Sequence, residues 1–348
     1  MKSLLCLLFF VSVKSLLAQQ DTTVVYFFDT SYIQLNHNTL SVGVFVPSKS
    51  VEFAVRTVKS EQEINFQPNG TGALGFSFAY HKYQIKLAFR TNSFSNDPTR
   101  YGETKSFDFR INHFGRRWVF DAHFLNYKGF YVTNPRDFIP GWDTKGPMPL
   151  LGLMQATSLG ISAIKIRNEY KFSYKAAYTQ NETQLKSAGS FLSGYFFQIC
   201  NINHPESMVP TALKAAVDSS LHLKNVSLIN GGVSFGYAHT FVLRKHFFIS
   251  FAIVPGLGLQ LTNLERVYST APYSRLGFSV RVLSDACFGY KGDKYFAGIS
   301  ARSESLSYSG KKQLLEFEIS QASFYVGRRF GSDGLEKRIK KTRTYLGL

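Results

Sequence analysis

Cysteine is nearly absent from this sequence, with three copies in 348 residues. Cys6 lies in an N-terminal apolar segment that we expect to be removed, too early to be the lipidated cysteine of a lipoprotein. Cys200 and Cys287 fall in strand-like runs. Two cysteines do not make a disulfide framework, so we expect two unpaired apolar side chains, although one disulfide is possible in an oxidising compartment.

Helical periodicity of useful length is also missing, apart from a weak pattern over residues 208–217. Two uncharged runs, residues 146–164 and 247–264, are long enough to imitate spanning helices. Proline, glycine and β-forming residues within both runs favour a strand, a bend and a further strand instead. We therefore expect no helical membrane span.

Acidic residues are scarce: the chain has 23 aspartates and glutamates against 40 lysines and arginines, which gives a formal net charge of +17. Residues 1–18 combine a basic start, an apolar core and Ala18 before a polar pair, which is typical of a secretory signal peptide. Its removal takes away Lys2 and Lys14 and no acid, so a strongly basic mature chain remains. An exported basic protein favours envelope partners over nucleic acid.

Aromatic residues are abundant, with 33 phenylalanines and 19 tyrosines, and they recur at alternate positions. In residues 72–90 one strand face on each side of a turn is apolar: Leu74, Phe76, Phe78, Tyr80, Tyr83, Ile85, Leu87 and Phe89. The opposite faces are small or charged. Similar hairpins recur over residues 104–127 and 231–254. The pattern predicts lipid outside and a polar lumen inside, whereas a soluble sandwich would pack the apolar face on a second sheet.

Connections between the expected strands are unequal. Tight links occur near residues 81–82, 115–116, 167–168, 244–245 and 292–293, and long polar segments occupy 91–103, 128–150, 201–229 and 261–272. Further strands are expected at 39–47, 51–58, 156–167, 170–179, 190–200, 273–288, 293–304 and 313–328. These features predict an all-β, antiparallel transmembrane β-barrel of about 12 strands, within roughly 10 to 14, with short periplasmic turns and longer outer loops.

The count of candidate strands puts the links at 167–168 and 244–245 on opposite rims, so one candidate is spurious or one strand is missed. We divide the chain into a signal peptide (1–18), a lead-in segment (19–38), an outer-membrane barrel (39–330) and a basic tail (331–348). The last strand ends in Phe330 and resembles the terminal strand that barrel-assembly machinery recognises. Expected partners are this machinery, outer-membrane lipid and lipopolysaccharide, and no nucleic acid.

Three segments resemble one family: KSFDFRINHFGRRWVFDAHFLNYKGFYV, NEYKFSYKAAYTQNETQLKSAGSFLSG and GYAHTFVLRKHFFIS. The family is catalogued as domain of unknown function 4421, exported barrel-like proteins of Bacteroidetes-type bacteria. The resemblance runs from roughly Asp21 to Phe330, and residues 127–130 and 186–190 are its most specific pieces. It implies an outer-membrane location and a barrel fold, and it brings no catalytic residues.

Candidates for chemistry are few. The eight histidines show no pair at metal-ligand spacing with a carboxylate or cysteine, so we expect neither a metal nor a cofactor. A hydrolase would need a serine with a histidine in reach, and Ser187, Ser190 and His113 are the candidates. No Gly-x-Ser-x-Gly elbow is present, and the small residues around both serines equally suit the start of a strand.

Two further groups could bind a ligand. The expected lumen residues Lys82, Lys86, Arg90, Asp108 and Arg110 suggest either an anion-selecting channel or a packed interior of salt bridges that would include Asp121, Glu316 and Glu318. The segment 128–150 carries Arg136, Trp142 and Lys145 among prolines. It could fold into the lumen as a plug, contact an anionic saccharide, or form a rigid surface loop.

The first functional prediction is an outer-membrane barrel that acts without catalysis, as an envelope structural protein or a narrow pore with a folded-in loop. The alternatives are a lipid-modifying hydrolase in the same barrel and a soluble periplasmic β-sandwich that binds an acidic ligand. The sequence leaves substrate, solute and oligomeric state open.

Overall fold

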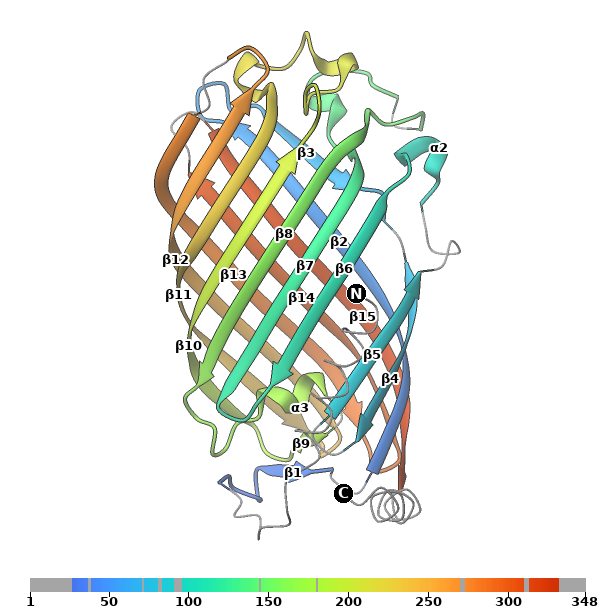
Figure 1. Cartoon of the computed structure of the whole chain (residues 1–348). Helices are drawn as coiled ribbons and strands as arrows, with labels where there is room; N and C mark the ends of the chain where they lie inside the picture. The colour runs from blue at the N-terminus through green and yellow to red at the C-terminus, as the bar shows by residue number, and fades with distance from the viewer. Residues whose placement is uncertain are drawn as a thin grey trace, which may run out of the picture.

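Thirteen of the described strands form one antiparallel sheet that closes on itself as a barrel, and two short strands form a separate sheet (Figure 1). The computed structural model describes residues 27–331 except 37–38, 71, 81–82, 91–95, 144, 180, 270–272 and 310–312. Over these residues, ten strands make the closed ring: β2 (Thr39–Thr57), β3 (Glu63–Pro68), β7 (Trp118–Val132), β8 (Leu150–Ile166), β10 (Ala188–Asn203), β11 (Leu223–Leu243), β12 (Phe247–Arg266), β13 (Tyr273–Lys291), β14 (Tyr295–Ser309) and β15 (Gln313–Gly331). The last strand, β15, closes the ring by pairing with β2 along their whole lengths.

Three further strands lie beside the ring: β4 (Ala73–Tyr80), β5 (Tyr83–Arg90) and β6 (Lys105–Phe114). The expected strands 39–47 and 51–58 are one strand, β2, which two short neighbours share. The lower part of β2, residues 40–45, pairs with β4, and residues 53–56 pair with β3. Between these parts β2 pairs with β15 alone. Pro47 lies in this stretch, where its lack of a backbone N–H breaks no hydrogen bond to a second neighbouring strand.

Gly129 marks the point at which β7 changes its partner from β6 to β3. Lys128 still pairs with β6, whereas Phe130 pairs with Pro68 of β3, and the register with β8 shifts between the two. Gly129 has a φ of +95°, and a Cβ there would lie 2.2 Å from the Glu103 carbonyl oxygen. Only glycine fits this bulge without strain.

The two rims of the barrel differ as the sequence predicted. The lower rim in Figure 1 carries the short connections β6–β7, β11–β12 and β13–β14. The upper rim carries long loops, with the short helices α2 (Pro98–Tyr101), η2 (Pro135–Asp137), η3 (Thr211–Leu213) and η4 (Ser219–Leu221). The expected helical pattern over 208–217 is reduced to η3.

One long connection breaks the rule at the lower rim, and we call residues 167–187 the α3 segment. It contains α3 (Tyr174–Tyr178) and β9 (Glu182–Gln184), which pairs with β1 (Ile33–Leu35). The predicted strand at 170–179 is therefore wrong. Ser173 caps α3 by accepting from the Ala176 N–H at 3.1 Å, and this capping favours a helix over a strand. Without that strand, the links at 167–168 and 244–245 lie on the same rim.

The two uncharged runs form strands β8 and β12. None of the helices in the described part of the chain is long and apolar enough to cross a membrane. Cys200 and Cys287 are buried and unpaired, as expected for two cysteines that do not make a disulfide framework.

The outer face of the barrel is apolar over its lower part and polar over its upper part. Along β12 the outward side chains are apolar from Phe247 to Leu261, and the strand then ends with outward Asn263 and Glu265. On β14 the large exposed apolar side chains stop at Ile299, and after Ala301 serines occupy the same face: Ser303, Ser305 and Ser307. The apolar band therefore covers only part of the barrel height.

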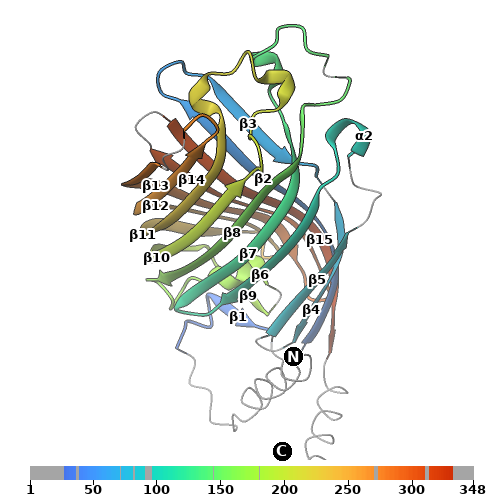
Figure 2. The same ribbon diagram turned by 45° about the horizontal axis from the view of Figure 1, so that its top comes forward.

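The interior reverses this order. In the upper part, inward apolar side chains of the ring form one core, which includes Phe53, Phe66, Leu125, Met154, Leu306 and Phe317. The upper loops cover this core (Figure 2) and add Phe138 and Leu213 to it. Below it, inward polar and charged side chains such as Arg281 and Asp285 lie beside a second, smaller apolar cluster that includes Ile164, Leu192, Val254 and Leu283. The buried ion pairs of the interior thus lie in the lower part of the barrel, behind the apolar outer band, whereas the upper interior is an apolar core.

Two acids that we expected in the lumen lie on the outer face instead. Glu318 accepts a hydrogen bond from Ser303 at 2.8 Å, and Glu316 accepts one from Ser307 at 3.4 Å. Their inward neighbours Leu315 and Phe317 belong to the upper core. The expectation failed because the apolar face of β15 was taken to face outward along the whole strand, whereas at this height it faces the interior.

We expect the apolar band to face lipid, and one pair of outward substitutions tests this. Ile253 lies in the middle of the band on β12 and is 55% exposed. Ile253→Arg should lower the free energy of unfolding by about 2–4 kcal/mol, because a cation near the bilayer midplane loses its hydration. Urea unfolding in phospholipid vesicles, followed by the heat-dependent gel shift, measures the change.

Ser305→Arg on β14 is the control, because its outward side chain lies between Ser303 and Ser307 on its own strand and opposite Glu318 of β15. This variant should unfold within about 0.5 kcal/mol of the parent protein, as exposed polar substitutions do. Equal losses in both variants would contradict the assignment of the band.

Candidate functional site

The barrel wall is interrupted between β5 and β6. Over the described residues, β5 pairs with β4 alone and β6 pairs with β7 alone. Figure 1 shows the two strands on either side of this opening. A strand edge without a partner presents free N–H and C=O groups, and each unsatisfied group costs several kcal/mol in lipid. The opening therefore requires water or a ligand along its edges.

Side chains close the seam above the opening. The Asn69 N–H donates to Thr104 Oγ1 at 2.8 Å, which joins the end of β3 to the start of β6. Lower down, Lys49 of β2 forms an ion pair with Asp108 of β6 across the seam. The Asp108 carboxylate also accepts from the Tyr127 hydroxyl at 3.1 Å. These contacts form the upper boundary of the opening.

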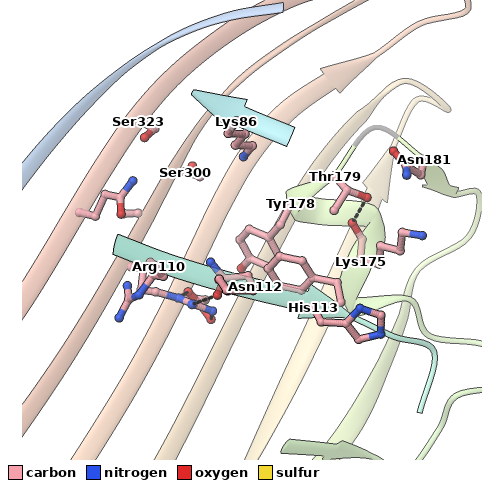
Figure 3. Close-up of a pocket in the computed structure, with 16 residues that line it drawn as sticks. Lys86, Arg110, Asn112, His113, Lys175, Tyr178, Thr179, Asn181, Ser300 and Ser323 are labelled. Atoms are coloured by element: carbon pink, nitrogen blue, oxygen red, sulfur yellow. Dashed lines mark hydrogen bonds and ion pairs between the residues drawn. The ribbon is translucent and has the colours of Figure 1, made fainter. Parts of the chain in front are cut away.

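A cavity of about 420 Å³ lies inside the opening (Figure 3). Lys86 of β5 and Arg110 of β6 line it from the two sides of the interruption. Ser300 and Ser323 line it from β14 and β15, and Tyr178 lines it from the α3 segment. The Tyr178 hydroxyl is buried and has no hydrogen-bond partner among the residues that the structure describes. The cavity therefore connects the lumen with the edges of β5 and β6.

A buried ionic network crosses the lumen beside the cavity. Arg302 of β14 places Nε 2.6 Å from Asp285 Oδ1 of β13 and Nη1 3.1 Å from Asp121 Oδ2 of β7. Arg110 of β6 places Nη2 3.4 Å from Glu304 Oε2 of β14. The network thus ties the β6–β7 wall to the opposite β13–β14 wall.

The charges of this network balance. Three arginines meet three carboxylates: Arg110, Arg281, Arg302, Asp121, Asp285 and Glu304. Charges removed from water need partners with good geometry, and here each carboxylate has at least one arginine. The network is consistent with a packed interior of salt bridges rather than with a row of unpaired cations.

One subset of the network has the composition of a metal site. Ligand atoms of Asp121, His123 and Glu304 lie within 4.8 Å of one another. Both carboxylates already accept from arginines, since Arg302 is 3.1 Å from Asp121 and Arg281 is 2.8 Å from Glu304. A divalent cation would have to displace these arginines from a balanced set of charges. The residues therefore fit a salt-bridge network better than a metal site.

The α3 segment closes the lower end of the lumen. Lys291, the last residue of β13, donates from Nζ to the Thr179 carbonyl at 2.8 Å and to the Glu182 carbonyl at 3.0 Å. The Tyr174 hydroxyl of α3 donates to Asp285 in the ionic network. A buried lysine and a buried tyrosine thus fix the segment to the barrel wall.

The expected lumen residues fall in different places. Lys86 and Arg110 line the cavity, and Asp108 belongs to the seam above it. Lys82 and the side chain of Arg90 lie outside the described residues.

The hydroxyls of the two candidate nucleophiles, Ser187 and Ser190, accept hydrogen bonds from backbone N–H groups at the lower rim. Ser190 is buried, and its Oγ accepts from the Asn168 N–H at 2.9 Å. Ser187 Oγ accepts from the Val242 N–H at 2.9 Å. Among the described residues, the hydrogen bonds of these hydroxyls include none to a histidine nitrogen. His113 lines the cavity from β6.

The loop that follows β7, residues 133–149, lies over the upper rim. Arg136 Nε donates to the Trp142 carbonyl at 3.2 Å, so the two candidates stabilise the loop itself. Phe138 packs on the upper core, and Lys145 is exposed. The loop covers the barrel, and the plug at the lower end comes from the α3 segment instead.

The sequence reasoning missed the most connected residues of the site, Asp285, Arg302 and Lys291. The signal for Asp285 was present, because it shares the inward face of β13 with Arg281 while Val280 and Val282 face outward. A charge opposite an apolar face in a predicted barrel strand marks the lumen. The partner of such a charge sits on a strand distant in sequence, which alternation does not identify.

Comparisons with known proteins give a family and distant structural likenesses. A family model described as "Domain of unknown function (DUF4421)" matches residues 28–330. The outer membrane protease OmpT from Escherichia coli aligns at 7% identity over 87% of this chain and 100% of that chain, with a TM-score of 0.38. The toluene transporter TodX of Pseudomonas putida aligns at 9% identity over 86% of this chain and 91% of that chain, with a TM-score of 0.26. No curated protein matches the chain.

We expect Arg302→Met to lower the free energy of unfolding by about 3 kcal/mol, because it leaves two carboxylates without their shared guanidinium in a largely dry site. The side chain of Arg302 is 16% exposed and that of Asp285 is 1% exposed. Urea unfolding in vesicles measures the loss.

The matched control is Arg117→Met at the lower turn between β6 and β7. The Arg117 side chain is 64% exposed, and its hydrogen bonds hold the pKa of the Glu169 carboxyl below the ordinary value. An exposed pair contributes about 1 kcal/mol or less. An equal loss in both variants would contradict the role of the network.

Zinc should leave the unfolding temperature of the parent protein unchanged, because arginines occupy the carboxylates of Asp121 and Glu304. A bound ion at a hundred times its dissociation constant would stabilise the fold by about 2.7 kcal/mol. Thermal unfolding with EDTA and with added Zn²⁺ compares the two states. A saturable rise that Glu304→Gln abolishes would show that the site binds metal.

Proposed function

The chain belongs to the family of domain of unknown function 4421, and from this premise we propose an outer-membrane β-barrel that acts without catalysis. In this proposal the lumen is closed along its axis, and the barrel binds its ligand through the opening between β5 and β6. The lower rim faces the periplasm, and the long loops face outward.

The exchange of polar and apolar faces along the strands carries the proposal. A barrel in water needs an apolar interior and a polar exterior, and the upper part has both. A barrel in lipid needs an apolar exterior and can hold charged groups inside, and the lower part has an apolar exterior around buried ion pairs. The change from one arrangement to the other within single strands supports a protein whose lower part spans a membrane and whose upper part projects into water.

The filled interior supports a barrel that is closed along its axis. The upper core contains large side chains such as Tyr308 and Phe53, each 1% exposed. Below it the ionic network crosses the lumen, and the α3 segment fills the lower end. An ion that followed the axis would have to cross an apolar layer, which is a barrier of the kind that closes channels.

The placement of the serines supports a role without catalysis. A serine nucleophile needs a base within hydrogen-bond reach, and the hydroxyls of Ser187 and Ser190 instead accept from backbone N–H groups. In this proposal the opening between β5 and β6, with the cavity behind it, is the functional feature of the barrel.

We expect the protein to purify from the outer membrane in detergent as a heat-modifiable band and to show no steady ion conductance in planar bilayers. Conductance is expected to stay absent after deletion of residues 174–184, because the apolar upper core lies above that segment. The deleted protein, checked for folding by the same gel shift, serves as the control for the plug. Stable open-channel steps in the parent protein would contradict the closed axis, and recovery in the soluble periplasmic fraction would contradict the location.

A further inference from the structure

We propose that the cavity behind the opening between β5 and β6 binds the anionic headgroup of an amphiphile whose acyl chain lies outside the barrel. This inference rests on the proposed membrane location. It adds a ligand class, a route of entry and a residue, Lys86, that recognises the charge.

The opening lies within the apolar band. On β5 the outward side chains Ile85, Leu87 and Phe89 are 60%, 51% and 62% exposed, and on β6 Phe107 and Phe109 are 60% and 52% exposed. Apolar side chains thus flank both sides of the interruption. A hydrocarbon chain can lie against them while a polar group passes between the strands.

The charges that line the cavity favour an anion. Among its four cationic side chains, Arg110 and Arg302 share the carboxylates of the network, and Lys175 lies 3.8 Å from Glu182. Lys86 has no carboxylate within ion-pair distance among the described residues. Its Nζ lies 5.9 Å from the ring centre of Phe45. Lys86 is therefore the cation of this site that a ligand can neutralise.

The cavity also offers hydrogen-bond donors. The Tyr178 hydroxyl is buried without a partner in the described part of the chain, and the hydroxyls of Ser300 and Ser323 line the wall opposite the opening. A buried polar group without a partner costs free energy, and a ligand that accepts from it recovers this cost. Headgroup oxygens such as those of a phosphate monoester are acceptors of this kind.

The size of the cavity fits a headgroup. Its volume of about 420 Å³ lies in the lower part of the range for small-molecule sites, about 300–1,000 Å³. The principal alternative occupant is an extended peptide that pairs with the free edge of β5 or β6. Such a strand would pair with backbone groups and would not depend on the charge of Lys86, so the two occupants respond differently to its removal.

The probe is dodecyl phosphate, added to the full mature chain in dodecyl maltoside micelles and counted as a bound adduct by native mass spectrometry. We expect one saturable adduct. Lys86→Gln should weaken it by about tenfold, the change that loss of one favourable ion pair of moderate strength gives. Lys105→Gln, at the upper end of β6 and outside the cavity lining, should leave it unchanged.

A second variant keeps the test independent of Lys86. Ser300→Phe narrows the cavity from β14 and should weaken binding without a change of charge, and the heat-dependent gel shift verifies that each variant is folded. Equal binding by Lys86→Gln and Lys105→Gln would overturn the proposal. Inorganic phosphate that competes at the same concentration as dodecyl phosphate would assign the site to a free anion and overturn the amphiphile. A co-purified peptide that persists in Lys86→Gln would assign the edges to a strand partner.

These outcomes are distinct from those of the proposed function. Binding is measured in micelles and does not depend on location or conductance. A protein that purifies from the outer membrane, conducts no ions and binds no dodecyl phosphate would refute this inference alone.

Discussion

Lateral hydrogen bonding of the backbone is the constraint on which the rest of this structure depends. A strand surrounded by lipid has no water to satisfy its N–H and C=O groups, so each strand must pair on both edges. The chain meets this demand around almost the whole ring, ending with the long pairing of β15 on β2. Closure then leaves an enclosed volume that side chains must fill, and the contents of the lumen follow from this.

In the proposed membrane setting, the lumen is filled in two ways because the barrel has two surroundings. Where water surrounds the upper part, burial of Phe53 and Phe317 stabilises the fold as in a soluble protein, since apolar area removed from water contributes about 25 cal/mol per Å². Where the outside is apolar, the interior provides the polar contacts, and Arg302 and Asp285 hold facing walls together. The boundary between these regions lies just above the ionic network, and there Lys49 and Asp108 close the seam.

The fold could be predicted from the sequence because barrel patterning is local. Alternation in residues 72–90 gives β4 and β5 with the correct outward faces, and the tight links give the lower rim. Two parts could not be predicted in this way. The α3 segment alternates over Phe172 and Tyr174, yet Ser173 caps a helix there. Whether Glu316 faces the lumen or the outside depends on its height in the barrel, and the alternation within β15 does not give that height.

The candidate site was only partly predictable for the same reason. Lys86 and Arg110 could be placed in the lumen because each stands opposite an apolar face of its own strand. The difference between them could not be predicted. Arg110 lies between the carboxylates of Asp121 and Glu304, of which Glu304 belongs to a strand distant in sequence, whereas Lys86 has no ion pair within the described residues. The unpaired edges of β5 and β6 arise because β2 pairs with β3 in its upper part and with β4 in its lower part. No residue pattern within β5 or β6 predicts these edges.

The opening is a consequence of that sharing. A single long strand between β2 and β7 would satisfy both neighbours and seal the wall. The chain instead divides this place between β3, which reaches both β2 and β7 only at the top, and β4, which pairs with β2 only at the bottom. Below β3 the wall therefore depends on β5 and β6, which turn free edges toward each other.

Free edges within an apolar band are costly unless polar groups occupy the gap, and the cavity with Lys86 lies behind it. The same division of β2 thus creates the unsatisfied edges and the polar space that a ligand can fill.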